Sequence, residues 1–265
     1  LGVAAATGVS VTVRTMLDPA VVAIWGWRIA FVIGGLGGAL SFVLRQSLQE
    51  SPEFMKMKAV AVRQPFSEVL RTRPAHVLAG IALLAGTACF NGLFFSHLPA
   101  YLSAVLKYDP RQAVAAQTTG VIAAALSILL VGRLASAVAP RYLLRAGVLL
   151  LMLGAFPFYS ALASRSLGLT TTLVLAGVVA GLTNGSFALL LTDLFPTRVR
   201  FTGVALVFNV AFTIFSGMSP LFATSMIRSS GSTSAPAWLM LGSAAIALAG
   251  SFGVKRLGGN VLAQG

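Results

Sequence analysis

The sequence predicts an all-α polytopic membrane protein, because it is rich in apolar residues, poor in charges, and regularly divided into apolar runs. Of its 265 residues, 57% are hydrophobic and 9% are charged, and the mean hydropathy is +0.90. A soluble domain carries about 25% charged residues, which cover its surface. This chain has too few charges for such a surface, so its surroundings must be largely lipid.

Eight apolar runs are candidates for membrane-spanning helices. A bilayer core about 30 Å thick requires roughly 20 helical residues. The candidate spans are residues 1–17, 27–44, 77–98, 113–132, 146–163, 170–191, 203–227 and 236–254. The first is short and carries Arg14, which suits either a clamp for a substrate carboxylate or a side chain that reaches the outer surface.

The basic residues predict the orientation of these spans. One group lies in the loops after the second, fourth and sixth spans and in the C-terminal tail: Arg45, Lys56, Lys58, Arg63, Arg71, Arg73, Arg133, Arg141, Arg145, Arg198, Arg200, Lys255 and Arg256. The smaller group lies in the opposite loops: Arg28, Lys107, Arg111, Arg165 and Arg228. Because cytoplasmic loops carry the excess of Lys and Arg, both chain ends are expected in the cytoplasm.

The net charge of +13 would suggest a nucleic-acid partner in a soluble protein. Here the bases lie between apolar runs and form no stripe, so we expect them to face anionic lipid, with no nucleic acid bound. The long gap at residues 45–76 holds six bases, three acids and several prolines, and predicts a cytoplasmic linker with a short helix beginning near Pro65. It divides the chain into the last two helices of an N-terminal bundle (1–44), the linker (45–76) and a C-terminal six-helix bundle (77–265).

Four short motifs resemble one transporter family. Residues 192–203 read TDLFPTRVRFTG, a short turn in which an acid closes one helix and two bases precede the next. This turn resembles the loop between spans ten and eleven of the major facilitator superfamily, in its metabolite:proton symporter branch. Residues 26–31 (GWRIAF), 48–54 (LQESPEF) and 94–102 (FFSHLPAYL) are similar to the start of the sixth span, the central loop and the end of the seventh span of that branch.

The resemblance covers essentially the whole chain and implies that it corresponds to spans five to twelve. Two helices then belong to the N-terminal half and six form the C-terminal half, and we expect the first four spans, as partners, to lie outside this chain. One motif departs from the family. Residues 132–142 (GRLASAVAPRY) lie where the family has Gly-x-Leu-x-Asp-Arg, so Ser136 and Ala137 replace its acid and base, and Arg133 and Arg141 are the candidates to substitute.

The resemblance also implies a function. It implies a secondary active transporter in the bacterial inner membrane that moves a small organic solute, such as a carboxylate or a zwitterionic osmolyte like proline or betaine, by alternating access. Protons would be the coupling ion, and no cofactor or metal is expected. In such carriers the substrate lies near the bilayer midplane, between the two halves.

Polar side chains inside the spans are the candidates for that cavity, and the alternative for each is a hydrogen bond that joins two helices. They form a face with aromatic residues in span 77–98, a stripe in span 203–227, and two single positions. The candidates are Asn91, Phe94, Phe95, Gln117, Asn184, Asn209 and Thr213.

Other polar residues lie at span ends. Asp193, Arg198 and Arg200 are expected in a gating or structural loop. His97 is a candidate proton relay, although its position two residues before Pro99 favours an interfacial cap.

No Asp or Glu lies in the middle of a predicted span. A proton-coupled carrier needs a titratable group there, so we expect the coupling group outside this chain and no transport by residues 1–265 alone. The alternative is a transport-incompetent truncated product or one subunit of a split carrier, with a structural or binding role. An enzyme is disfavoured, because the two histidines are far apart and the single cysteine, Cys89, lies in an apolar run.

Overall fold

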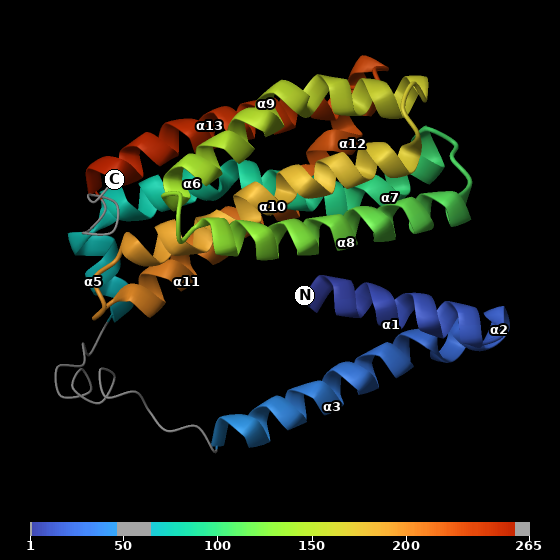
Figure 1. Ribbon diagram of the computed structural model, residues 1–265, viewed down its shortest axis with the longest axis horizontal. Helices are drawn as coiled ribbons and strands as arrows, with labels where there is room; N and C mark the ends of the chain where they lie inside the picture. The colour runs from blue at the N-terminus through green and yellow to red at the C-terminus, as the bar shows by residue number, and fades with distance from the viewer. Residues whose placement is uncertain (1, 47–64, 258–265) are drawn as a thin grey trace. The chain divides into compact units, whose positions relative to one another are not determined.

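The computed structural model describes residues 2–46 and 65–257, and every regular element within these ranges is a helix (Figure 1). The chain divides into two compact units, Leu1–Ala61 and Val62–Gly265. Most of the predicted linker, residues 47–64, lies outside the described residues. The short helix expected near Pro65 is present as α5 (Pro65–Thr72).

The first unit is a helical hairpin. Helix α1 (Gly2–Met16) is followed by α2 (Pro19–Val21), a π-helical turn (Val22–Gly26) and α3 (Trp27–Gln46). At the turn, the Arg28 guanidinium lies 4.3 Å from the ring centroid of Trp27, a cation–π contact that suits a membrane surface.

The second unit contains six long helical segments besides α5. Its remaining elements are α6 (Pro74–Asn91), α7 (Leu98–Ala100), α8 (Pro110–Leu134), α9 (Pro140–Ser164), α10 (Leu169–Asp193), α11 (Arg200–Ala211), α12 (Ser219–Ser230) and α13 (Pro236–Leu257). Several begin with proline, which has no N–H to leave unpaired in the first turn of a helix. Three π-helical segments, Gly92–His97, Tyr101–Val105 and Phe212–Gly217, continue α6 into α7, extend α7, and join α11 to α12.

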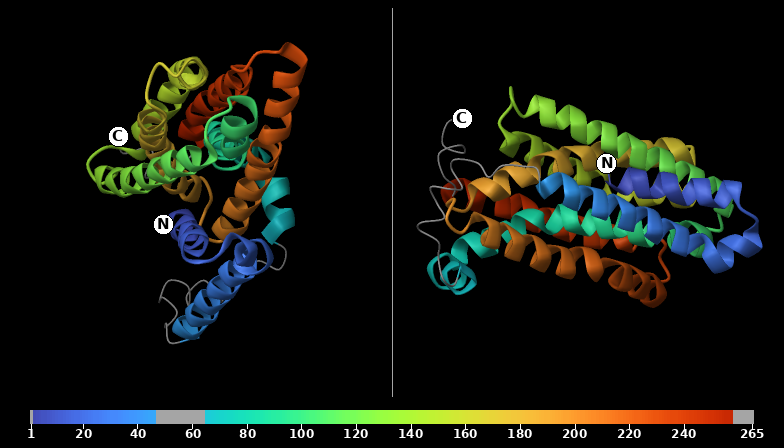
Figure 2. Two further views of the ribbon diagram at one scale, coloured as in Figure 1. Left: turned by 90° about the vertical axis from the view of Figure 1, so that its right-hand side faces the viewer. Right: turned by 90° about the horizontal axis from the view of Figure 1, so that it is seen from below.

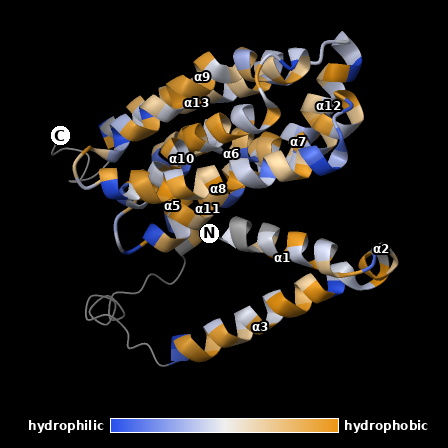
Figure 3. Ribbon diagram, turned by 45° about the vertical axis from the view of Figure 1, so that its right-hand side comes forward, coloured by the Kyte–Doolittle hydropathy of each residue, from blue (hydrophilic) through white to orange (hydrophobic). Residues whose placement is uncertain are grey.

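Seven helices of the described part are long and apolar enough to cross a membrane. They are Ile24–Gln46, Pro74–Val105, Pro110–Leu134, Pro140–Ser164, Leu169–Asp193, Arg200–Ser230 and Pro236–Val254. Apolar residues predominate along them (Figure 3). They correspond to the last seven of the eight predicted spans. The first predicted span is helical as α1, but with 15 residues it is too short to be counted, so the number eight is not confirmed.

Close backbone contacts hold the six-helix bundle together (Figure 2). Helix α6 packs on α13, α10 packs on α8 and α9, and α13 also packs on α9. At Gly250 of α13, an added Cβ would lie 2.6 Å from the amide nitrogen of Leu83 in α6. At Gly120 of α8, it would lie 2.8 Å from the carbonyl oxygen of Leu173 in α10. Since lipid gives little hydrophobic drive for helix association, such contacts supply dispersion attraction instead.

The span that begins at Pro74 is longer than predicted. The predicted span ended at Leu98, but the helix continues to Val105. The π-helical segment Gly92–His97 widens the turn that precedes Pro99, which lets the chain pass a residue without an N–H. His97 therefore lies inside the helical segment and is buried, with 6% of its surface exposed.

Adding a side chain at Gly250 is expected to destabilise the protein. Gly250→Leu forces α13 away from α6, and overpacking of this kind costs about 1–3 kcal/mol, or roughly 2–12 °C in melting temperature. Gly242→Leu on the same helix is the matched control, because no atom lies within 4 Å of its added Cβ. Thermal unfolding in detergent measures both variants, and equal melting temperatures would contradict this packing.

Candidate functional site

A reciprocal pair of amides lies near the middle of two spans. Asn91, at the end of α6, donates from Nδ2 to Oδ1 of Asn184 in α10 over 3.0 Å, and Asn184 returns the bond over 3.2 Å. Asn184 also donates to the carbonyl oxygen of Ala180 at 3.0 Å. Both side chains are half-buried. The sequence predicted both residues separately, and the structure brings them together; each keeps unused acceptor or donor capacity that a bound molecule could meet.

Three stacked aromatic rings that the sequence interpretation missed lie on α10 and on the span that contains α11, and the first of them is one helical turn after Asn184. Phe187 is three residues after Asn184, on the same face of α10. Its ring stacks on Phe208 of α11 with centroids 6.2 Å apart, and Phe208 stacks on Phe212 at 4.2 Å. All three are half-buried or partly exposed. The i, i+4 spacing of Phe208 and Phe212 beside Asn209 was the available signal. We call Asn91, Asn184, Phe187, Phe208 and Phe212 the amide–aromatic face.

The two aromatic residues that the sequence did predict, Phe94 and Phe95, lie one turn after Asn91 along the same span. Phe94 is buried, stacks on Phe90 at 5.1 Å, and meets Phe95 edge-on at 5.2 Å. Gln117 of α8 donates to the carbonyl oxygen of Phe94 at 2.6 Å. Its own Oε1 is buried without a hydrogen-bond partner. Gln117 thus joins α8 to the π-helical segment Gly92–His97 and supplies a hydrogen-bond donor to one of its backbone carbonyl oxygens.

The polar stripe predicted for α11 does not form one continuous line. Asn209 and Thr213 are exposed, and Asn209 donates only to the carbonyl oxygen of Ala205, at 2.8 Å. Ser216 is half-buried and accepts a bond from Ser219 at its carbonyl oxygen. The π-helical segment Phe212–Gly217 changes the number of residues per turn, so spacings derived from an α-helix lose register there.

His97 lies in a buried aromatic cluster. Its ring is 5.6 Å from that of Tyr101, and its Nε2 has no hydrogen-bond partner. Tyr101 donates from its hydroxyl to the carbonyl oxygen of Thr233 at 2.8 Å and meets Tyr159 edge-on. The cluster does not contain the amide–aromatic residues.

The loop predicted from Asp193, Arg198 and Arg200 is held by α5. The Arg198 guanidinium pairs with the Glu68 carboxylate, and Arg200 donates from Nε to the carbonyl oxygen of Phe195 at 3.1 Å. Asp193 closes α10, and its Oδ2 is buried without a partner.

Apolar burial anchors both sides of this contact. Val69 of α5 is fully buried, and Phe195 of the loop is 1% exposed, whereas the side chain of Arg198 is 55% exposed. The sequence placed Glu68 in the linker but did not predict its pairing.

Arg133 and Arg141, the candidates to substitute in the motif of residues 132–142, are placed differently, and the charged contact between helices is made by a later arginine. Arg133 is exposed, while Arg141 is buried with its guanidinium 4.9 Å from the ring of Tyr142. Arg145, one turn later, donates from Nε to the Oγ of Ser251 at 3.0 Å and from a terminal nitrogen to the Ser251 carbonyl oxygen at 3.1 Å, which ties α9 to α13.

The amide–aromatic face can bind a small molecule through amide hydrogen bonds and through the faces of its aromatic rings. No group of three or more His, Cys, Asp or Glu in the described part of the chain could hold a metal ion. The amide–aromatic face offers donors, acceptors and π faces but no ionised side chain. It can hold a small polar solute by hydrogen bonds and an ammonium group by cation–π attraction.

Comparison with known proteins identifies relatives along nearly the whole chain. The family model of the Major Facilitator Superfamily matches residues 2–220. A citrate-proton symporter of Klebsiella pneumoniae is 29% identical over 241 residues, covering 90% of this chain and 54% of the relative. A proline/betaine transporter of Escherichia coli K12 is 27% identical over 257 residues, covering 91% of this chain and 50% of the relative. The chain thus spans about half the length of the curated relatives it matches.

A solved structure shares the fold. A crystal structure of a bacterial homolog of the human lysosomal transporter Spinster, in an inward-facing and unoccupied conformation, matches with a TM-score of 0.58 and 18% identity. The match covers 89% of this chain and 61% of that chain. Together with the seven apolar helices, these similarities identify an integral membrane protein.

Breaking the amide pair is expected to weaken the contact of α6 with α10. Hydrogen bonds between membrane helices contribute about 0.6 kcal/mol on average and up to about 1.7 kcal/mol. Asn91→Ala and Asn184→Ala should each destabilise the protein within this range, and the double variant should lose little more than either single one. Asn209→Ala, whose amide bonds only within its own helix, is the control. Additive losses in chemical unfolding would show that the two amides do not interact.

The buried valine of α5 is expected to matter more than its ion pair. Val69→Ala removes apolar burial worth about 1–2 kcal/mol, whereas an exposed ion pair contributes about 0.2–1 kcal/mol. Trypsin cleavage after Arg71 in the purified protein reports whether α5 is docked. We expect faster cleavage in Val69→Ala than in Glu68→Gln, with Leu70→Ala as the exposed control. The opposite ranking would assign the anchoring to the charges.

Proposed function

This chain belongs to the major facilitator superfamily, and from that premise we propose that it forms part of a secondary transporter that moves a small organic solute together with protons by alternating access. The observation that supports this most directly is the amide–aromatic face near the middle of the spans. Polar groups are costly inside a membrane, and carriers place their solute at this depth. The names of the relatives, citrate-proton symporter and proline/betaine transporter, describe the same class of activity.

The solute class follows from the chemistry of the face. The carboxylate of an organic acid or of a zwitterionic osmolyte can accept a hydrogen bond from the second Nδ2–H of Asn91. Both Nδ2–H groups of Asn184 already donate, to Asn91 and to Ala180. The ring faces of Phe187, Phe208 and Phe212 favour a solute that also carries an ammonium group. We therefore propose a zwitterion as the favoured class of solute and a carboxylate as the second candidate. Phe94, Phe95 and Gln117 would shape one end of the cavity. Asn209 of α11 and Thr213 of the π-helical segment that follows would contact the solute from another side.

Proton coupling requires a group that titrates inside the membrane. Among the described residues, the middle third of each of the seven apolar helices contains no Asp or Glu. His97 is a candidate relay within this chain, because it is a titratable side chain whose buried Nε2 has no hydrogen-bond partner among the described residues. The principal coupling group would then lie in the other part of a complete carrier, and residues 1–265 alone would not transport.

The organisation of the carrier is proposed on the same basis. Helix α1 would serve as an eighth membrane helix, so that α1 and α3 belong to an N-terminal half and the six spans from Pro74 onward form the C-terminal half. Residues 45–76 would link them, and the Asp193–Arg200 turn with α5 would act as a gate or brace on the cytoplasmic side. The thirteen bases on that side support cytoplasmic chain ends in a bacterial inner membrane.

A second role is a structural or binding one, as a transport-incompetent product or as one subunit of a split carrier. The coverage of about half of each relative supports considering it. Neither role is enzymatic, since the relatives are transporters.

Uptake into cells that produce the complete protein tests the proposed function. We expect accumulation of radiolabelled glycine betaine or proline above that of citrate, and loss of the accumulation when a protonophore removes the proton gradient. Accumulation that a protonophore leaves unchanged would contradict proton coupling. No accumulation of any of the three solutes would contradict the solute class.

A matched pair of variants connects uptake to the face. Loss of one cation–π contact costs about 0.5–2 kcal/mol, so Phe208→Ala should raise the KM for uptake roughly 2- to 30-fold. Leu129→Ala, an exposed residue of α8, should leave the KM unchanged. Equal KM values for the two variants would place the solute elsewhere.

A further inference from the structure

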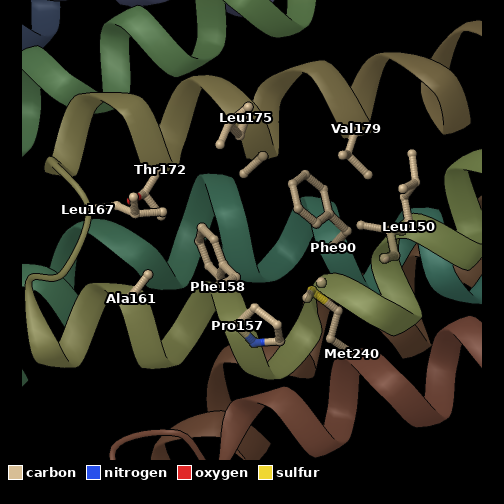
Figure 4. A pocket seen from close by; sticks show the side chains of 13 residues that line it. Phe90, Leu150, Pro157, Phe158, Ala161, Leu167, Thr172, Leu175, Val179 and Met240 are labelled. Carbon is tan, nitrogen blue, oxygen red and sulfur yellow. The ribbon is translucent and has the colours of Figure 1, made fainter.

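An elongated apolar cavity separates α9 from α10, away from the amide–aromatic face. Its volume is about 190 Å³. Leu150 and Ala161 of α9 form one wall, Leu175 and Val179 of α10 form the other, and Phe90 and Met240 close the bottom (Figure 4). We call this cavity the α9–α10 slot.

Small residues on α9 create the slot. Gly154, Pro157 and Ala161 follow the spacing i, i+3, i+7, so they lie on one face of the helix. At one end the helices touch, because a Cβ at Gly147 would lie 2.8 Å from the Cβ of Leu182. At the other end the short connection of residues 165–168 joins the helices. The slot therefore lies between a close contact of the two helices at one end and their short connection at the other.

The lining of the slot is almost entirely carbon. The one hydroxyl, on Thr172, already donates to the carbonyl oxygen of Gly168 at 3.2 Å. Water needs two to four polar partners to occupy a cavity, so it gains little here, whereas dry cavities of about 150 Å³ bind small apolar molecules. The occupant must therefore be apolar.

The rim of the slot faces the bilayer. Leu150, Leu167 and Leu175 are 45%, 49% and 55% exposed, and they belong to or flank two membrane-spanning helices. The solvent at this depth is lipid hydrocarbon. From Leu150 to Ala161 the helix rises about 16 Å, which suits a chain more than a compact molecule.

The end of the slot also carries positive charge. Arg165, in the connection that closes the slot, is exposed and donates to the carbonyl oxygen of Lys107 at 3.3 Å. Its guanidinium also lies 4.4 Å from the centroid of the Tyr108 ring. A lipid whose chain entered the slot would bring its phosphate toward this guanidinium, and Arg is well suited to phosphate.

We propose that the α9–α10 slot is a binding site for one acyl chain of a phospholipid from the leaflet that borders residues 165–168. This site is separate from the solute site and does not depend on the proposed transport activity. Phe90 connects the two regions, because it closes the slot and stacks on Phe94.

Photo-crosslinking tests the site directly. The purified protein is reconstituted in phosphatidylethanolamine and phosphatidylglycerol with a trace of phosphatidylcholine that carries a diazirine near the end of one acyl chain. After illumination, trypsin cleavage at Arg145, Arg165 and Arg198 separates the two walls into residues 146–165 and 166–198 for mass spectrometry. We expect Leu175 and Val179 to be labelled more strongly than Leu129 and Leu130, which are exposed on α8.

Filling the slot provides the matched comparison. No atom lies within 4 Å of a Cβ added at Gly154 or at Gly242, so both sites accept a side chain. Gly154→Phe should reduce labelling of Leu175 and Val179 to the level of Leu129, and Gly242→Phe should leave it unchanged. Ala176→Leu fills the slot from the opposite wall and repeats the test if Gly154→Phe does not fold.

Two results would overturn the proposal. One is labelling of the slot no stronger than that of Leu129 and Leu130, or unaffected by both filling variants. The other is slot labelling by a small diazirine-substituted benzene but not by the lipid, which would identify a site for compact apolar molecules.

Discussion

Polar groups inside a bilayer have no water to bind, and this constraint explains most contacts of the bundle. The chain meets it by using few polar side chains and by pairing them. The amides of Asn91 and Asn184 satisfy each other across α6 and α10, and Arg145 is held by Ser251 across α9 and α13. Elsewhere, backbones approach closely at Gly120 and Gly250. The unpaired donors and acceptors that remain are therefore informative about function.

The π-helical segments and the amide–aromatic face occur in the same part of the bundle. Asn91 immediately precedes the segment Gly92–His97, and Phe212 begins the segment Phe212–Gly217. Segments of this kind are frequent at functional sites, because they re-aim side chains and leave backbone groups open to other partners. Gln117 uses such an opening when it bonds the carbonyl oxygen of Phe94. Two of the three spans that carry the proposed solute site are thus irregular, and the third, α10, is a continuous α-helix.

The sequence predicted the helices better than their contacts. Apolar runs located seven membrane-spanning helices, and Pro65 located α5, because burial in lipid and proline chemistry are local signals. The predicted length of the span that contains Pro99 was wrong, because a π-helical turn cannot be recognised from the spacing of residues.

The sequence also did not predict which residues of the candidate site contact one another. Asn91 and Asn184 are 93 positions apart, and only packing shows that they pair. The sequence interpretation did not single out Phe187 and Phe208 for the same reason.

The most direct measurement uses Phe208→Cys in a Cys89→Ala background, modified by a water-soluble thiol reagent. We predict that Phe208→Cys is modified and that a saturating concentration of the transported solute slows this modification, whereas Leu129→Cys is unreactive in lipid. A rate of Phe208→Cys modification that the solute leaves unchanged would contradict a solute site at the amide–aromatic face.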